Sequence, residues 1–220
     1  PAALAAELDR VARAIQVLEQ VGPSRGARAG QAPSDAPEKI VHRVLAIQRE
    51  SAELISRLGN LRRQLEQLEI WGDVRLEQLA QLRAAGVDVQ FAIVDADAAG
   101  QVRAELVQPL HAVSRRRLFI AAVNPRPDAG AGTAPQAGPR ENWLPEGSAA
   151  APLPARDRPS IRAEAAEIDA RLKADADELA SLAAALPALR AERDRVRQQV
   201  DFAVASNSGL DNADLFAIQG

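Results

Sequence analysis

Few residues in this chain have the types and the spacing that chemistry requires. Its 220 residues include two histidines, His42 and His111, and no cysteine, so thiolate metal sites and disulfide frameworks are excluded. The histidines lie far apart, and neither has carboxylates at ligand spacing. No glycine-rich phosphate loop, HExxH zinc motif or GxSxG nucleophile motif occurs in the sequence. We therefore expect no catalytic residue, no metal and no cofactor.

Three consecutive arginines and one tryptophan are the candidates for contact with a partner. Arg115, Arg116 and Arg117 could meet an anionic partner, although a solvated turn leading into a strand is the simpler interpretation. Trp143 lies in an irregular stretch and is the better candidate for an exposed contact. Trp71 fits better as packing between a helix and the lobe that follows it, since its large ring fills such a joint.

The composition is typical of thin helical packing. Hydrophobic residues make up 47% of the chain but aromatic residues only 3%, so leucine and alanine must fill the core. The net charge of −3 argues against a nucleic-acid-binding face. No apolar run reaches the roughly 20 residues of a membrane span, and no signal-peptide pattern opens the chain. Because Pro1 falls within an apolar helical pattern, we expect a piece of a longer protein.

Apolar residues recur at alternating steps of four and three in three segments, as in the seams of coiled coils. These segments are residues 1–20, 38–70 and 158–209. Ser51 interrupts the second seam, and Asp175 and Arg193 interrupt the third. Polar residues at such positions cost stability but fix the alignment of the helices. Pro187 cannot donate a backbone hydrogen bond, so it predicts a bend in the last helix.

Between the second and third helices the pattern changes to that of a small mixed α/β lobe. Asp73 is the expected N-cap of a short helix that Gly86 ends. His111 falls in a segment expected to be a loop, and Gly209 is the expected end of the last helix. The further expectations are a strand at 87–93, a short helix at 97–107, a strand at 117–123, an irregular segment at 141–157 with a possible edge strand, loops at 21–37 and 124–140, and the start of a strand at 215–218.

These elements define an α+β protein that is predominantly helical. Long helices with narrow apolar seams need a partner, and antiparallel pairing is the simplest solution, with residue 40 near residue 189. The prediction is a long antiparallel two-helix coiled-coil arm with the small mixed α/β lobe inserted at the turn. Residues 1–20 are expected to cover the part of the last helix that extends past its first partner.

Several short motifs occur in an order that carries a family resemblance. They are LEIWGD at 68–73, AGVDVQF at 85–91, LPEG at 144–147, PLP at 152–154 and DLFAIQG at 214–220. With these motifs the chain resembles the cytoplasmic N-terminal region of subunit I, the a-subunit, of V-type and A-type rotary ATPases. The resemblance covers nearly the whole chain, and the proline- and glycine-rich loops depart from the family pattern as insertions.

The resemblance implies a stator role without catalysis. In this family the region links the membrane sector of a proton- or sodium-translocating ATPase to the peripheral stalk. The distal lobe then binds peripheral-stalk helical subunits, the proximal end meets other membrane-sector subunits, and the parent is a multi-pass protein at the cytoplasmic face of a membrane complex. The implied divisions are a helix and loop of the membrane-proximal lobe at 1–37, a first arm helix at 38–70, a distal α/β lobe at 71–157, a return arm helix at 158–209 and the first strand of the truncated proximal lobe at 210–220.

Two other classes of protein are alternatives at this point. One is a chromosome-organising or other structural coiled-coil protein with a hinge-like lobe. The other is an enzyme or ligand-binding domain built on the lobe. The neighbouring gene sequence separates them, because several apolar spans downstream support the stator and an ATPase phosphate-loop motif upstream supports the chromosome-organising protein.

Overall fold

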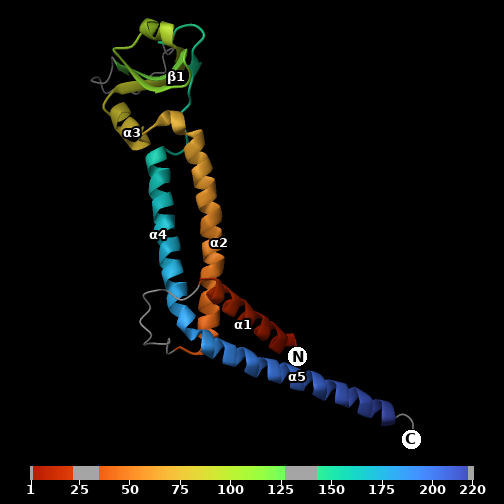
Figure 1. Cartoon of the computed structure of the whole chain (residues 1–220). Helices are drawn as coiled ribbons and strands as arrows, with labels where there is room; N and C mark the ends of the chain where they lie inside the picture. Colours follow the sequence, from red (N-terminus) through yellow and green to blue (C-terminus); the bar gives the residue numbers. More distant parts are fainter. Residues whose placement is uncertain (1, 22–34, 127–142, 218–220) are drawn as a thin grey trace. The chain divides into compact units, whose positions relative to one another are not determined.

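The chain is an α+β protein that is mostly helical and contains a four-stranded antiparallel sheet (Figure 1), as the sequence predicts. The computed structural model describes the backbone of residues 2–21, 35–126 and 143–217. Over these ranges, none of the helices combines the length and the hydropathy that crossing a membrane requires. Two compact units are present, which are unit 1, with Pro1–Arg57 and Ile168–Gly220, and unit 2, with Leu58–Glu167.

All three helical segments expected from the heptad spacing form. They are α1 (Ala2–Val21), α2 (Pro37–Gln67) and a last segment made of α4 (Arg158–Leu182), the 3-10 turn η3 (Ala183–Ala185) and α5 (Leu186–Ala217). The turn η3 comes just before Pro187, which has no N–H to donate to the carbonyl of Ala183. The expected bend therefore takes the form of a 3-10 turn, and the chain changes direction there (Figure 1).

The C-terminal part of the last segment differs from the expectation. Gly209 does not end the helix, because α5 continues to Ala217. The strand expected over 210–220 is therefore wrong over 210–217, and residues 218–220 lie outside the described residues. A glycine inside a helix costs only about 1 kcal/mol relative to alanine. The following residues contain no proline, so nothing in the sequence stops the helical hydrogen bonds from continuing.

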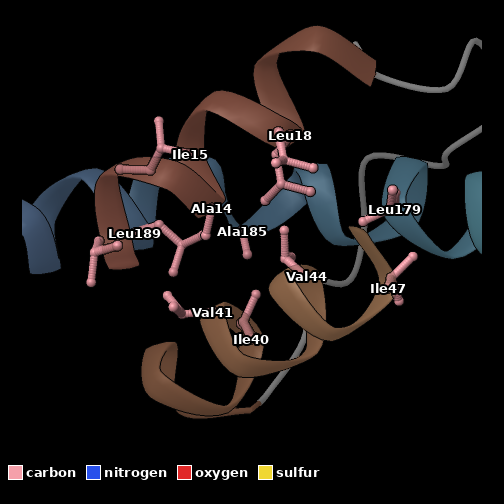
Figure 2. Close-up of a cluster of buried hydrophobic side chains, with 12 residues drawn as sticks. Ala14, Ile15, Leu18, Ile40, Val41, Val44, Ile47, Leu179, Ala185 and Leu189 are labelled. Atoms are coloured by element: carbon pink, nitrogen blue, oxygen red, sulfur yellow. The ribbon is translucent and has the colours of Figure 1, made fainter. Parts of the chain in front are cut away.

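Unit 1 has a buried core where α1, α2 and the junction of α4 with α5 meet (Figure 2). Leu18, Val44 and Leu189 are completely buried in it. Ile40 belongs to the same cluster as Leu189, as antiparallel pairing predicts. At the edge of this core, Arg190 of α5 donates to Glu19 of α1 at 2.7 Å. Helix α1 therefore covers the start of α5, as expected. The buried members are Val11, Ala14, Ile15, Val17, Leu18, Ile40, Val41, Val44, Ile47, Leu179, Ala185 and Leu189.

Unit 2 carries the sheet. Its elements between α2 and α4 are the 3-10 turn η1 (Glu69–Trp71), α3 (Leu76–Ala84), β1 (Val87–Asp95), the 3-10 segment η2 (Ala96–Gln101), β2 (Leu106–Ala112), β3 (Arg117–Pro125) and β4 (Ala149–Ala150). The strand order is β2-β3-β1-β4, and all neighbours are antiparallel. The short strand β4 pairs with Ala92 and Ile93 alone. Strand β2 is thus the longer of the two edge strands.

The sheet packs apolar side chains on both faces, because successive residues of a strand point to opposite sides. On one face the ring of Trp71 lies 4.9 Å from those of Phe91 and Phe119, measured between centroids. Trp71 is buried there, in agreement with its expected role as packing between helix and lobe. On the other face Ile120 is completely buried, with Ala92, Val94, Val102 and Ala122 around it.

The strands expected at 87–93 and 117–123 form as β1 and β3, and the possible edge strand at 141–157 forms as β4. The short helix expected at 97–107 is wrong after Gln101, because the chain continues into β2. His111 lies on this strand and not in a loop. Pro109 breaks the strand pattern in the sequence, but an edge strand tolerates a residue without an N–H.

The N-terminus of α3 also differs from the expectation. Its N-cap position is Arg75, and the side chain of Asp73 does not cap this helix terminus. Instead the carboxylate of Asp157 accepts the N–H of Leu76 at 2.9 Å. Gly86 follows this helix with a φ of 82°, a backbone angle that glycine adopts at low cost. Most of the loops expected at 21–37 and 124–140 lie outside the described residues.

Candidate partner-binding surface

The three candidate arginines lie at the hairpin that joins β2 to β3. Within this turn the N–H groups of Val113 and Ser114 donate to the carbonyl of Arg117 at 3.0 and 3.2 Å. The carbonyl of Arg116 accepts the N–H of Ala96 at 2.8 Å, which ties the turn to the start of η2. The sequence-based expectation of an exposed turn leading into a strand is therefore confirmed. The backbone of the turn is fixed, and its arginine side chains are exposed.

The arginines of the turn differ in their partners. Arg117 forms an ion pair with Asp95, with 3.6 Å between its Nε and the carboxylate Oδ1. Arg115 and Arg116 are exposed, and neither guanidinium has an ion-pair partner within the part of the chain that the structure describes. Within the described residues, two positive charges without an ion-pair partner thus project from a hairpin whose backbone is hydrogen-bonded. Such charges favour an acidic partner.

The edge strand β2 adds an exposed apolar row beside these charges. Leu106, Leu110 and Val113 are 56%, 36% and 42% exposed. No residue from Leu106 to Val113 carries a formal charge when histidine is neutral. A register shift lies between Pro109 and His111, and Pro109 lacks an N–H, so both features limit pairing with a further strand. The row is therefore better suited to side-chain packing against a partner than to strand addition. We call Leu106, Leu110, Val113, Arg115 and Arg116 the β2 surface.

Trp143 is placed differently from the arginines. It is half-buried and packs against the apolar cluster around Ile120. Its carbonyl accepts the N–H of Arg103 at 2.8 Å, just after the end of η2. The carbonyl of Arg116 holds the start of the same segment. The structure thus ties Trp143 and the arginine turn to opposite ends of η2.

The two histidines belong to different units. His111 is half-buried on β2 opposite Phe119, and His42 is exposed on α2. Among the described residues, no group of three or more His, Asp or Glu side chains could hold a metal ion.

A carboxylate that the sequence analysis did not single out links two helices of unit 2. Asp157 Oδ2 accepts the N–H of Leu76 at 2.9 Å, and Oδ1 accepts the N–H of Ser160 at 2.8 Å. Asp157 thereby caps both α3 and α4. Burial raises the pKa of Asp157, but hydrogen bonds from Ser160 and Leu76 outweigh this effect and lower it. An aspartate directly before Arg158-Pro159 signals the cap of α4, whereas nothing in the sequence signals its contact with α3.

In unit 1, helices α2 and α4 present opposite charges to each other. Arg43 donates from Nε and Nη2 to the two carboxylate oxygens of Glu178, both at 2.6 Å. These hydrogen bonds lower the pKa of Glu178, and burial opposes them. Arg171 of α4 pairs with Glu50 of α2 at 2.9 Å. The two pairs join residues in opposite chain order, so these parts of α2 and α4 are antiparallel.

Fold and surface together describe a class of protein in which paired helices have an α/β unit inserted between them in the chain. No family model and no curated protein matches the sequence. The chain is similar to the crystal structure of the cytoplasmic N-terminal domain of subunit I, homolog of subunit a, of V-ATPase. That match has 19% sequence identity and a TM-score of 0.29, and it covers 91% of this chain and 72% of the other.

Proposed function

We propose that this chain is a stator region of a proton- or sodium-translocating rotary ATPase of the V/A type. In this proposal it links the membrane sector to the peripheral stalk and takes no part in catalysis. The observation that carries the proposal is the antiparallel packing of α2 and α4, with ion pairs Arg43–Glu178 and Glu50–Arg171 between them. The ordered motifs of the sequence resemblance support the same assignment.

A rotary motor needs a part that resists torque while the rotor turns, and paired helices suit this task. The hydrogen bonds of a helix run along its axis, so they oppose stretching and compression. The apolar seams of α2 and α4 each need a partner, and packing against each other buries both. We propose that the two helices form the coiled-coil arm predicted from the sequence, which carries load between its ends.

The partner at the distal end is a helical subunit of the peripheral stalk. We assign its contact to the β2 surface, to Arg117 of the same turn and to the half-buried Trp143. Leu106 and Leu110 offer apolar area to a helix, and Arg115 and Arg116 offer charge to acidic residues on it. The predicted distal lobe, residues 71–157, contains all of these residues.

The residues around α1 and α5 are assigned to the membrane-proximal end, where other membrane-sector subunits bind. This places the chain at the cytoplasmic face of a membrane complex. The parent protein then carries its own membrane spans outside this sequence.

Binding to a purified peripheral-stalk dimer from the same genome tests the proposal. We expect the full chain to bind the dimer at micromolar concentration in biolayer interferometry, with an affinity that falls as salt is raised. Arg115→Glu together with Arg116→Glu is expected to weaken binding by at least about tenfold, since each reversal places like charges together.

Arg62→Glu with Arg63→Glu is the matched control, because these exposed arginines lie in the same unit but on α2. We expect this control to bind as the parent does. Absence of binding by the parent chain at tens of micromolar would count against the stator proposal. Equal losses in the two double variants would reject the β2 surface as the contact.

A further inference from the structure

Two polar residues in the interior of unit 1 meet across the packed helices. Ser51 interrupts the apolar seam of α2, and Asp175 interrupts that of α4. In the structure the Ser51 hydroxyl donates to Asp175 Oδ2 at 3.3 Å. Asp175 is 2% exposed, so its carboxylate is buried between the packed helices. The polar interruptions of two separate seams are thus partners of each other.

A second group satisfies the other oxygen of the same carboxylate. Arg171 lies one turn before Asp175 on α4, and its Nε lies 3.2 Å from Asp175 Oδ1. The same guanidinium reaches Glu50 on α2 through Nη2 at 2.9 Å. Arg171 therefore connects the buried carboxylate to the facing helix through a second route. Both oxygens of Asp175 thus have a partner, one from its own helix and one from the facing helix.

Other alignments of α2 along α4 lose the contact of Ser51 with Asp175 and the pair of Glu50 with Arg171, whereas Arg171 stays beside Asp175 on its own helix. A slide of about one turn would place Ile47 or Leu54 opposite Asp175, and a slide of one heptad in one direction would place Val44 there. None of these side chains can donate a hydrogen bond, so Oδ2 of the buried carboxylate would be left without the donor that Ser51 supplies, which is destabilising. The apolar seam alone is less selective, because it repeats along both helices.

We propose that Ser51 and Asp175, supported by Arg171, form a register lock that selects one antiparallel alignment of α2 and α4. The lock gives up part of the stability that an apolar seam would supply in return for a unique alignment. It concerns the selection of the fold by the sequence, so it holds whether or not the chain is a stator.

Distance measurements between two spin labels test the lock, and the absence of native cysteine makes labelling specific. Cysteines replace His42 and Lys173, which are exposed on α2 and α4. These positions are offset along the helix pair, so a slide of one turn changes their axial separation by about 5 Å. The labels are read by pulsed electron paramagnetic resonance in the otherwise unchanged chain.

The decisive variant carries Ser51→Leu and Asp175→Leu, which makes both seams apolar. We expect a higher melting temperature together with a broadened or second distance, whereas the parent gives a single narrow distance. The matched control carries Ala52→Leu and Ala176→Leu, at neighbouring exposed positions, and keeps the parent distance. A leucine variant with the narrow distance of the parent would overturn the lock. If that variant does not fold, the smaller Ser51→Ala and Asp175→Ala pair is read by the same criterion.

Discussion

Asp157 gives the sharpest prediction about stability. Its two carboxylate oxygens cap different helices, since Oδ1 accepts the N–H of Ser160 in α4 and Oδ2 accepts the N–H of Leu76 at the start of α3. Asp157→Ala removes both acceptors and leaves two helix N-termini without a side-chain cap. The variant should therefore destabilise unit 2 by more than an ordinary surface substitution does.

The geometry sets the size of the effect. Removal of an N-cap side chain costs about 1 kcal/mol, so the loss of both caps predicts a decrease of about 2 kcal/mol in the free energy of unfolding. An asparagine has one carbonyl oxygen where aspartate has two acceptors. Asp157→Asn can therefore keep one cap and should lose about half of that free energy.

The same contacts predict a dependence on pH. The pKa of Asp157 is lowered in the folded chain, since the hydrogen bonds from Ser160 and Leu76 outweigh the opposing effect of burial. A group of this kind stabilises the fold above its unfolded pKa of about 3.9 and loses that contribution as the pH falls through the lower, folded pKa. The difference between the parent and Asp157→Ala should be complete at neutral pH and shrink below about pH 4.

Urea unfolding followed by tryptophan fluorescence measures this effect, because both tryptophans, Trp71 and Trp143, lie in unit 2. The control is Asp73→Ala, which removes the exposed ion pair of Asp73 with Arg162 and should change stability by less than about 0.5 kcal/mol. The reasoning is refuted if Asp157→Ala unfolds at the urea concentration of the parent. It is also refuted if Asp73→Ala is the more damaging change.

Three further substitutions test the cores and the last helix. Leu18→Ala should lower the free energy of unfolding of unit 1 by about 3 kcal/mol, because Leu18 is completely buried. Urea unfolding followed by circular dichroism measures this loss, and a loss below about 1 kcal/mol would show that α1 is not firmly packed. Phe119→Ala should lower the free energy of unfolding of unit 2 by about 4 kcal/mol and alter the fluorescence of Trp71, whose ring packs against Phe119. Unchanged fluorescence would contradict the packing of these two rings. Arg193→Leu should raise the free energy of unfolding by about 1 kcal/mol, because leucine buries apolar area at this half-buried position. The ion pair that is lost joins Arg193 to its neighbour Asp194 on the same helix. A clear decrease in melting temperature would reveal a specific ionic partner.

Periodicity was sufficient to predict the elements whose side chains follow one rule along their length. Helices α1 and α2 and strands β1 and β3 lie close to their expected positions. Strand β2 does not follow such a rule, because Pro109 and the register shift beside it interrupt the alternation of side chains. An edge strand tolerates both features. Helix α5 continues past Gly209, where the sequence predicts its end, because a glycine can be accommodated inside a helix.

Contacts between residues that are distant in the sequence are harder to predict than helices and strands. The sequence identified Ser51 and Asp175 as polar residues in separate seams, but only the alignment of α2 with α4 shows that they meet. The capping of α3 by Asp157 depends on residues 81 positions apart, so the nearer Asp73 was the natural but wrong choice. The sequence predicts the arginine turn, whereas the half-burial of Trp143 depends on the sheet face that it covers.

The most direct test of the stator proposal is the composition of the native complex. The full-length parent protein is tagged in its own organism, extracted from membranes in mild detergent, and analysed by quantitative mass spectrometry. The proposal predicts that the catalytic-head, peripheral-stalk and membrane-rotor subunits of a rotary ATPase co-purify with it in fixed ratios. Recovery with a chromosome-organising ATPase, or without any rotary ATPase subunit under conditions that keep that enzyme intact, would contradict it.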